Sequence, residues 1–475
     1  MPRAEDLVSG PLTLLDKVWN EHVVADLGDD FALIHVDRQL IHDLSGTRAL
    51  LALAETGHAV RNPELTFATP DHTVSTLPNF GHTGPRYDKC VNPLREHSRR
   101  HGIRLFDIGE PGHGIVHVIG PELGLTLPGA TILCGDSHTC THGGLGALAW
   151  GIGASEIVHV LVTQTVIQRK PKRMRITFDG ALSGGVEPKD LILHAIGRLG
   201  TAAGDGYAIE YAGSAIETMS IEGRMTVCNL SIELGAKIGM VAPDEATFQF
   251  IDGREMAPTG EIWETAVEHW RSLHSDDGAT FDTEIAIDAA EIGPQVTWGT
   301  SPEHVIAVDQ PVPDPAVEPD ADKRQAMAAA LAYSGLEPGT PMEGIAIDQV
   351  FIGSCTNSRL SDLRRSAELA RGRKVADHVR AWVVPGSQDV KHAAEAEGLN
   401  RVFTEAGFEW REPGCSLCVG SNGETVAAGQ RCVSTTNRNF VGRQGKDSRT
   451  HLVSPGMAVA AAISGRISDV RKMEM

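Results

Sequence analysis

Two segments of the sequence share one pattern, an apolar run that ends at a glycine and opens into a polar loop. They are ATILCGDSHTC at residues 130–140 and IAIDQVFIGSCTN at residues 345–357. Apolar runs of this kind are typical of buried strands. In the second case a helical segment, SDLRRSAELARG, follows and ends at Gly372. This alternation predicts an α/β fold, and the likeness between the two segments indicates two related units that face each other.

The length of the chain predicts more than one domain. At 475 residues it is too long for a single compact core. The Pro- and Asp-rich run DQPVPDPAVEPDAD cannot hold a regular ladder and is typical of a linker. We therefore expect three α/β units, over residues 1–180, 181–300 and 301–475.

Local patterns predict three further elements. Apolar residues at helical spacing predict a helix from Leu14 to Val24, with Thr13 as its N-cap. Residues 143–167 are rich in small residues and predict a helical region. A strand is expected from Met174 to Phe178.

The net charge of the chain limits the kinds of molecule that it is expected to bind. The formal net charge is −20, which disfavours nonspecific nucleic-acid binding, because that needs a broad basic surface. An anionic substrate would need arginines or lysines gathered locally. The N-terminal MPRAEDLVSG contains acidic residues and no long apolar run, so neither a signal peptide nor a membrane anchor is expected, and we predict a cytoplasmic protein.

The most informative cysteines form a CxxC pair, Cys415 and Cys418, in REPGCSLCVGSNG. Eight cysteines in a chain of this length are too few for a disulfide scaffold, which leaves redox exchange or metal binding. The surroundings do not resemble a thioredoxin-like βαβ unit. A structural zinc site needs four ligands, but there is no second CxxC, and Cys432 is the only other cysteine close by.

A third thiol can come from GSCTNS, where Cys355 follows a predicted strand and precedes a predicted helix. Backbone N–H groups and the helix dipole are expected to stabilise its thiolate. Three thiolates on a four-iron cluster would leave one iron free to bind substrate oxygen as a Lewis acid. The residues alone favour this hypothesis only modestly, and zinc binding or inert packing stay open.

Several motifs together resemble the aconitase family. These are GSCTNS, PGCSLCVG, GDSHT and STTNRNFVGRQG, which fall in the family's order, and the likeness runs from LLDKVWNEHVV to HLVSPGMA. EGRMTVCNLSIELGAKIGMVAPDE and EAGFEWREPGCSLC are similar to one branch in particular, the large subunits of isopropylmalate isomerases. The resemblance implies an α/β fold of three α/β/α units around a central cluster cleft. It also implies one [4Fe-4S] cluster on Cys355, Cys415 and Cys418.

The resemblance also assigns roles to three histidines. His72, in FATPDHTVST, is similar to the proton donor to the leaving hydroxyl, with Asp71 tuning it. Without the resemblance this pair would be interpreted as a capped loop with a surface histidine. His117 and His138 match the family's other active-site histidines, although either could be a core residue. Polar residues that match those orienting the imidazoles and the substrate are Asp136 and Ser137.

Charged residues complete the implied site. Glu233, in CNLSIELGA, either faces solvent on an amphipathic helix or, by resemblance, contacts the hydroxyl at the open iron, with Asn229 close by. Arg438 and Arg443, in TTNRNFVGRQG, match the carboxylate-binding arginines, whose planar guanidinium groups suit bidentate pairing. The neighbouring Asn437 is expected to assist them.

The resemblance implies a missing part as well. Full-length aconitases continue into a mobile fourth (swivel) domain that supplies the carbon-proton base, a serine, and a further arginine for the substrate. This sequence stops soon after HLVSPGMAVAAAISGRISDV. We therefore expect a separate small subunit to supply that domain and the base, which gives a heterodimer that is active only when assembled.

The expected activity is a hydro-lyase reaction that interconverts 2- and 3-isopropylmalate through 2-isopropylmaleate in leucine biosynthesis. Departures from the family pattern at residues 42–47, 71–76 and 419–423 put the substrate in doubt more than the reaction class. A paralogue acting on citramalate, 2,3-dimethylmalate or homocitrate is therefore the main alternative. An RNA-binding protein or a structural zinc protein are the remote ones.

Overall fold

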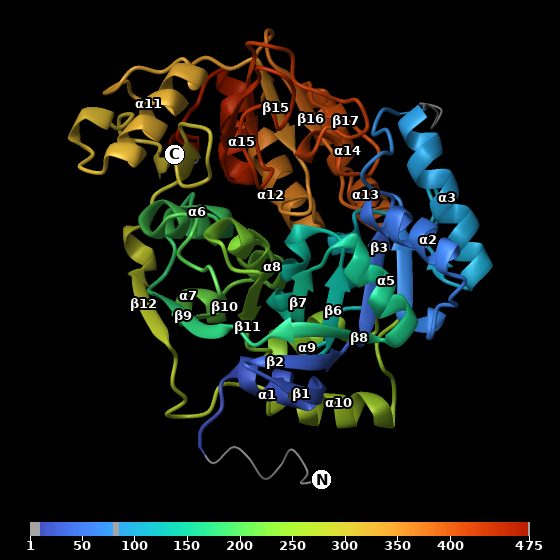
Figure 1. Cartoon of the computed structure of the whole chain (residues 1–475). Helices are drawn as coiled ribbons and strands as arrows, with labels where there is room; N and C mark the ends of the chain where they lie inside the picture. The colour runs from blue at the N-terminus through green and yellow to red at the C-terminus, as the bar shows by residue number, and fades with distance from the viewer. Residues whose placement is uncertain (1–9, 79–84, 474–475) are drawn as a thin grey trace.

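The structure is a computed structural model that describes residues 10–78 and 85–473 (Figure 1). The prediction of no leader concerns residues 1–10, almost all of which lie outside this described part. Among the described residues, no helix is both long enough and apolar enough to cross a membrane.

The first parallel sheet has the strand order β5-β4-β3-β6-β7. Its strands are β3 (Arg38–His42), β4 (Thr66–Thr69), β5 (Arg104–Leu105), β6 (Thr131–Cys134) and β7 (Leu148–Gly151). Leu40 of β3 pairs in register with Phe67 of β4 and Cys134 of β6. Every residue of β4 and β6 is buried, as expected for parallel strands that are covered on both faces.

Two more sheets are also entirely parallel. The second has the order β11-β10-β9-β12, with strands β9 (Lys172–Asp179), β10 (Tyr207–Ala212), β11 (Ile238–Val241) and β12 (Thr283–Asp288). The third has the order β17-β16-β15-β18-β19, with strands β15 (Gln349–Ile352), β16 (Arg380–Val383), β17 (Glu409–Trp410), β18 (Arg431–Ser434) and β19 (Arg449–Leu452). In Figure 1 the third sheet, orange to red, lies above the other two.

Shorter antiparallel pieces and helices surround these sheets. The antiparallel strands are β1 (Val23–Gly28), β2 (Phe31–His35) and β8 (Thr165–Arg169) in one sheet, and β13 (Gln295–Thr297) and β14 (Val305–Ala307) in another. The α-helices are α1 (Leu14–His22), α2 (Ser45–Thr56), α3 (Pro85–His101), α4 (Val116–Glu122), α5 (Ala154–Thr163), α6 (Pro188–Leu199), α7 (Ser214–Glu217), α8 (Ile221–Asn229), α9 (Glu245–Ile251), α10 (Glu261–Arg271), α11 (Ala321–Ser334), α12 (Leu360–Ala370), α13 (Gln388–Ala396), α14 (Leu399–Ala406) and α15 (Pro455–Ser464). Short 3-10 helices are η2 (Pro63–Leu65), η3 (Ser137–Leu145), η4 (Leu230–Leu234), η5 (Ala289–Glu291), η6 (Pro315–Val317), η7 (Ser416–Cys418) and η8 (Val470–Lys472).

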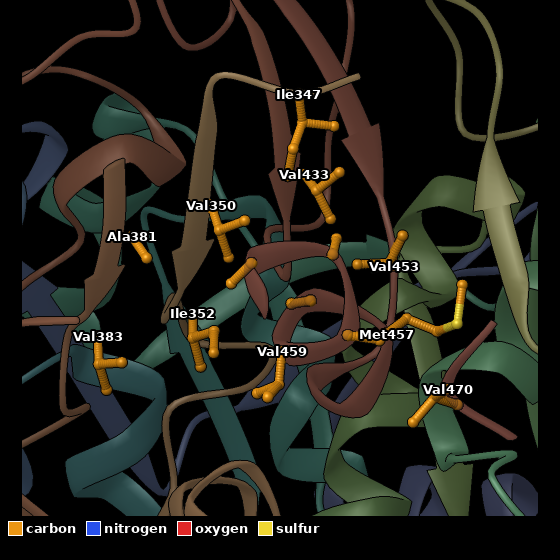
Figure 2. Close-up of a cluster of buried hydrophobic side chains, with 14 of the residues drawn as sticks. Ile347, Val350, Ile352, Ala381, Val383, Val433, Val453, Met457, Val459 and Val470 are labelled. Carbon is orange, nitrogen blue, oxygen red and sulfur yellow. The ribbon is translucent and has the colours of Figure 1, made fainter. Parts of the chain in front are cut away.

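The core of the third sheet forms where α15 packs on it. Figure 2 shows side chains of β15, β16 and β18 around this helix, and they belong to one buried cluster that includes Val350, Ile352, Ala381, Val383, Val433, Met457 and Val459. The helix sequence PGMAVAAAIS is mostly small residues, so its backbone approaches the sheet closely. The same cluster extends to all three predicted cluster cysteines, which are therefore buried at the edge of a rigid core.

The predicted α/β fold is confirmed, and so are several local elements. The Thr13 side chain caps α1 by accepting a hydrogen bond from the Asp16 N–H, as expected, but the helix ends at His22. Val23 and Val24 instead begin β1, in keeping with the preference of β-branched residues for strands. Gly372 has a φ of 72°, which fits its predicted place just after α12.

The prediction of a helical region over residues 143–167 is wrong in part. Only α5 is an α-helix there, and it lies between strands β7 and β8. The buried strand β7, Leu148–Gly151, lacks the apolar–polar alternation that would have marked it, because it is an edge strand covered on both faces. The strand predicted at Met174–Phe178 is confirmed as part of β9. The division of the chain at residues 180 and 300 stays a prediction.

Two glycines allow the sheets to meet. A Cβ on Gly143 in η3 would overlap the carbonyl oxygen of Gly239 in β11, which joins the first sheet to the second. A Cβ on Gly114 would lie 2.5 Å from the Cα of Ser387, where the two residues form an antiparallel bridge between the first and third regions. In both places the obstructing atoms belong to the backbone, so they cannot move aside cheaply.

We predict that Gly143→Ala destabilises the whole chain, because the added methyl group must push η3 away from β11. Overpacking of this kind costs about 1–3 kcal/mol, which corresponds to an apparent Tm lower by about 5 °C. Thermal scans at one fixed rate measure the effect. Gly184→Ala is the control, since its Cβ would meet nothing within 4 Å. Equal Tm values for the two variants would contradict this account of the packing.

Candidate active site

The predicted site residues lie just beyond the carboxyl ends of strands from two sheets. In the first sheet β4 leads to Asp71 and His72, and β6 leads to Asp136 and His138. In the third sheet β15 leads to Cys355, β17 to the CxxC loop, and β18 to the loop from Asn437 to Arg443. Ligands of open α/β sheets bind at this edge, because there the loops diverge and leave side chains free to converge.

These loops line one cavity of about 300 Å³. The predicted residues that line it are Asp71, His72, His117, Asp136, Ser137, His138, Cys355, Cys415, Cys418, Arg438 and Arg443. The other three, Asn229, Glu233 and Asn437, stand directly behind the lining and contact its side chains. Segments from distant parts of the sequence are thus brought together around one space.

The three cysteines are buried, unpaired thiols, each at most 8 % exposed. Side-chain amides surround their sulfur atoms. Asn229 Nδ2 lies 3.2 Å from Cys355 Sγ, and Asn437 bridges two cysteines, with Nδ2 3.5 Å from Cys355 Sγ and Oδ1 3.6 Å from Cys418 Sγ. Donors that point at cysteine sulfur are a common feature of iron–sulfur sites.

The spacing of the three sulfur atoms does not suit a single zinc ion. Among the described residues, the one group of three or more ligand-type side chains whose donor atoms all lie within 4.8 Å of one another is His42, Asp43, Asp71 and His72. The three cysteines do not form such a group. One zinc ion, with Zn–S bonds of about 2.3 Å, would hold its sulfurs about 4 Å apart. The three thiols are therefore too far apart to bind one zinc ion together.

The prediction that the dipole of a helix stabilises the Cys355 thiolate is wrong. Helix α12 begins only at Leu360, with Arg359 as its N-cap, so Cys355 is not at the helix terminus. Burial raises the pKa of the Cys355 thiol to about 12 and that of Cys415 well above its usual range. A thiolate at Cys355 therefore needs a source of positive charge other than the helix dipole, such as a metal ion would provide.

Two serines beside the cysteines have unusual backbone conformations. Ser354 has a φ of 79° and Ser416 a φ of 47°, a region that costs non-glycine residues about 1–3 kcal/mol. Both are fully buried, and Ser354 Oγ lies 3.4 Å from Cys418 Sγ. Ser354 directly precedes Cys355, and Ser416 lies between Cys415 and Cys418, so both strained residues lie next to the cavity-lining cysteines.

The Asp71–His72 pair is held rigidly. His72 Nδ1 lies 2.5 Å from Asp71 Oδ1, and the Val116 N–H donates to Asp71 Oδ2 at 3.0 Å. Burial alone would lower the pKa of His72, but the negative charges of Asp71 and Cys415 and the hydrogen bonds with Asp136 and Asp71 together raise it well above its ordinary value. The charge interaction with His72 lowers the pKa of Asp71 to about 2 despite burial. The imidazole is thus a cation that can give up a proton.

Asp136 is surrounded by three histidines. Its carboxylate oxygens lie 3.3 Å from His72 Nε2, 3.2 Å from His117 Nε2 and 3.4 Å from His138 Nδ1. Burial would raise the pKa of Asp136, but these imidazoles together lower it well below its usual range. A single, partly buried carboxylate therefore contacts all three rings.

Glu233 is buried rather than surface-exposed, on the 3-10 helix η4. Its Oε1 lies 2.6 Å from Arg438 Nε and 3.2 Å from His138 Nε2. Burial opposes ionisation, but the hydrogen bond with His138 and the Arg438 charge together lower the pKa of Glu233. The carboxylate therefore has the partners that a buried charge requires.

The structure adds polar residues that the sequence did not single out. His42, Ser45, Arg48 and Arg86 line the cavity, and the His42 ring stacks on the His72 ring at 4.3 Å. His42 is the last residue of β3 and Ser45 lies three residues further on, a position that could have indicated them. Arg48 and Arg86 lie on helices α2 and α3, and no local sequence signal marks them.

Two further buried residues, His142 and Asp43, hold site residues in place. His142 Nε2 lies 3.1 Å from His117 Nδ1, which fixes the second nitrogen of that ring. Asp43 accepts the backbone N–H groups of Asp71, His72 and Thr73 at 3.0, 2.9 and 2.7 Å. The loop that contains His72 is thereby wrapped around one buried carboxylate.

Two segments that depart from the family pattern contact each other. Glu424 accepts the Thr76 N–H at 2.7 Å and the Ser416 hydroxyl at 2.5 Å. Asn422 donates to the Val74 carbonyl at 2.9 Å. Residues 74–76 are thus joined to residues 416–424 by a strap of hydrogen bonds that holds the CxxC loop.

Comparison with known proteins identifies the class. The aconitase family profile, described as aconitate hydratase, matches residues 16–465, and the chain belongs to this family. A solved structure, the holo-form of Thermococcus kodakaraensis aconitase X, matches 90 % of this chain and 89 % of its own, with 15 % sequence identity and a TM-score of 0.47.

One curated relative is far more similar. The chain is 63 % identical over 462 residues to the 3-isopropylmalate dehydratase large subunit 1 of Bradyrhizobium diazoefficiens, and the alignment covers 97 % of each chain. The family resemblance drawn from the motifs is thereby confirmed.

We predict that Glu424→Ala loosens the CxxC loop, because the loop loses the hydrogen bonds of Thr76 and Ser416. Losing bonds of about 1–3 kcal/mol should speed the reaction of the buried thiols with a disulfide reagent by about 5–100-fold in metal-free protein. Glu412→Ala is a matched control, since Glu412 lies in the same loop but pairs with Lys391 at its half-buried edge. Equal thiol reaction rates in the two variants would contradict the strap.

Proposed function

We propose that this chain is the cluster-bearing catalytic subunit of an isopropylmalate isomerase, which interconverts 2- and 3-isopropylmalate by dehydration and rehydration in leucine biosynthesis. The observation that carries the proposal is the convergence of three buried thiols and a cationic histidine on one cavity. The identity of 63 % with a 3-isopropylmalate dehydratase large subunit supports the choice of substrate.

The proposed cofactor is one [4Fe-4S] cluster held by Cys355, Cys415 and Cys418. Support comes from their burial, from their spacing, and from the amide donors of Asn229 and Asn437. When bound, the cluster supplies one iron without a protein ligand, which acts as a Lewis acid for the substrate hydroxyl.

The chain's own residues then handle the departing hydroxyl. The carbon–oxygen bond breaks with its electron pair on oxygen, and His72 Nε2 donates the proton that completes a water molecule. Asp71 and Asp136 hold the imidazole in place before and after this transfer. His117 and His138 line the same cavity and are oriented by Asp136, and Ser137 and Glu233 provide further polar contacts for the hydroxyl.

The proton on the neighbouring carbon needs a base, and we propose that a small-subunit partner supplies it. The printed name of the relative, a large subunit, supports such a partner. Once that proton has left, its bonding electrons form the alkene, 2-isopropylmaleate. Readdition of water at the other carbon gives the isomer, so the two directions use the same groups.

Arginines around the cavity suit a dicarboxylate. Arg438 and Arg443 come from one loop, and Arg48 and Arg86 come from helices of the first unit. Local gathering of guanidinium groups reconciles an anionic substrate with a chain of net charge −20. We propose that Arg438 and Arg443 hold one carboxylate, and that Arg48 and Arg86 attract the other.

Anaerobic reconstitution tests the function. With ferrous iron, sulfide and the small-subunit partner, wild type should convert 2-isopropylmalate, whereas the isolated chain should show no turnover. His72→Asn should lower kcat by about 10²–10⁴-fold at unchanged cluster content, because it removes the proton donor. The exposed His58→Asn is the control and should keep wild-type activity.

Three results would each contradict one part of the proposed function. Zinc without acid-labile sulfide would exclude the cluster. Turnover by the isolated chain would show that the chain does not lack the catalytic base. If citramalate, 2,3-dimethylmalate or homocitrate reacted faster than isopropylmalate, the chain would be a paralogue with the same reaction class.

We predict that replacing both Arg48 and Arg86 with glutamine weakens substrate binding rather than the chemical step. KM for 2-isopropylmalate should rise about 5–50-fold, with kcat within about threefold of wild type. Arg99→Gln, an exposed arginine on the same helix α3 as Arg86, is the control. An unchanged KM in the double variant would show that these arginines do not bind the substrate.

A further inference from the structure

A second cavity, which the proposed mechanism does not use, lies at the amino ends of strands β9, β10 and β11. It has a volume of about 600 Å³, against about 300 Å³ for the active-site cavity, and the two share no lining residue. Its walls come from the turn between β8 and β9, from the first residues of these three strands, and from Trp150 in β7. A cavity of this size is typical of sites for small organic molecules.

The lining of this cavity carries an excess of positive charge. It has four cationic and two anionic side chains, which are Arg169, Lys170, Lys172 and Lys237 against Asp30 and Asp205. Three of the four cations come from one short run of sequence, RKPK at residues 169–172. In a chain of net charge −20, a local excess of cations indicates an anionic ligand.

Two of these cations have no carboxylate partner. Arg169 and Lys170 each pair with a carboxylate, at 3.2 and 2.7 Å. Lys172 and Lys237 are exposed, and no carboxylate oxygen in the described part of the chain lies within 4.0 Å of either ammonium group. Two such ammonium groups match the charge of a phosphate monoester, which is close to −2 at neutral pH.

The buried part of the lining is apolar. Trp150 and Ile238 are only 1 % and 3 % exposed, and the half-buried Ile232 and Tyr207 extend the same surface. The indole N–H of Trp150 has no hydrogen-bond acceptor among the described residues. A phosphate ion alone would leave this surface uncovered. Apolar and aromatic side chains beside cations instead suit a ligand that joins a charged group to a flat ring.

One carboxylate of the lining narrows the class of ligand further. Asp205 is exposed, and its side chain neither pairs with a cation nor accepts a hydrogen bond within the part of the chain that the structure describes. It repels a simple anion, whereas it is a good acceptor for a ligand that carries hydroxyl groups. Ribose hydroxyls donate to carboxylates in this way in dinucleotide sites.

One wall of the cavity is fixed by contacts on its far side. Ile232 and Gly235 line the cavity, and between them lies Glu233, whose carboxylate is 2.6 Å from Arg438 Nε. Gly235 has a φ of 92°, and a Cβ there would lie 2.8 Å from the carbonyl oxygen of Thr201. The backbone of this wall is therefore closely packed, so the cavity is preformed rather than shaped by a ligand.

We propose that this cavity binds a nucleoside monophosphate, with its phosphate at Lys172 and Lys237, its ribose hydroxyls at Asp205, and its base on the apolar surface beside Trp150. Each part of such a ligand corresponds to one part of the lining. The inference goes beyond the proposed function and does not rest on it, because no residue of the active-site cavity takes part.

Isothermal titration calorimetry of the full-length chain with adenosine 5′-monophosphate tests the inference. One molecule should bind per chain, with a Kd below about 1 mM. Replacing both Lys172 and Lys237 with glutamine should raise Kd at least about tenfold, because two charge-assisted contacts are lost. Lys323→Gln, which changes an exposed lysine on helix α11, is the control and should keep the wild-type Kd.

Partial ligands and one further variant test the assignment of each contact. Adenosine lacks the phosphate and inorganic phosphate lacks the ring, so each should bind at least about tenfold more weakly than the whole nucleotide. Asp205→Ala should raise Kd about 3–10-fold, because the ribose loses its acceptor. A lower Kd in Asp205→Ala would show that this carboxylate only repels the phosphate, and would overturn the nucleoside assignment.

Three other results would also overturn the inference. These are no binding of adenosine 5′-monophosphate at millimolar concentration, an equal Kd for inorganic phosphate, and displacement of the nucleotide by 2-isopropylmalate, which would place it in the active-site cavity. The variants change exposed side chains, and thermal scans check that each one is folded. None of these results affects the reconstitution test of the proposed function, so the two can fail separately.

Discussion

One buried residue, Asp71, connects the parts of the site. Its carbonyl accepts the Cys415 N–H at 2.9 Å, its Oδ1 lies 2.5 Å from His72 Nδ1, and its Oδ2 accepts the Val116 N–H at 3.0 Å. The cysteine loop of the third sheet, the cationic histidine of the first sheet and the start of α4 are therefore fixed relative to one another. Because the carboxylate is inaccessible to water, each of these contacts is strong and costly to break.

Positively charged side chains gather at the site, although the chain as a whole is strongly negative. A protein of net charge −20 gathers a cationic histidine and arginines around one cavity. The carboxylates among them, Asp136 and Glu233, are each bound by a histidine or an arginine, so they orient cations instead of repelling an anionic ligand. A local charge pattern of this kind gives specificity for a small dicarboxylate without making the surface basic.

Much of this architecture could be predicted from the sequence. Motifs such as GDSHT and GSCTNS follow apolar strands, and in a parallel sheet that position leads to a shared edge, which explains why so many of the predicted residues line one cavity. The strand β7 could not be predicted, because a strand buried on both faces lacks apolar–polar alternation. Arg48, Arg86 and the Glu233–Arg438 pair depend on tertiary contacts, in the last case between residues far apart in the sequence. The supposed helix-dipole support for Cys355 failed because α12 begins five residues later, at Leu360.

The proposed cluster has three cysteine ligands, which would leave one iron without a protein ligand. Mössbauer spectroscopy of protein reconstituted with ⁵⁷Fe tests this directly. We predict about four iron atoms per chain in a spectrum in which one differs from the other three, and this one alone changes when 2-isopropylmalate is added. A spectrum of equivalent irons that ignores the substrate, or a preparation that binds metal without sulfide, would contradict the account.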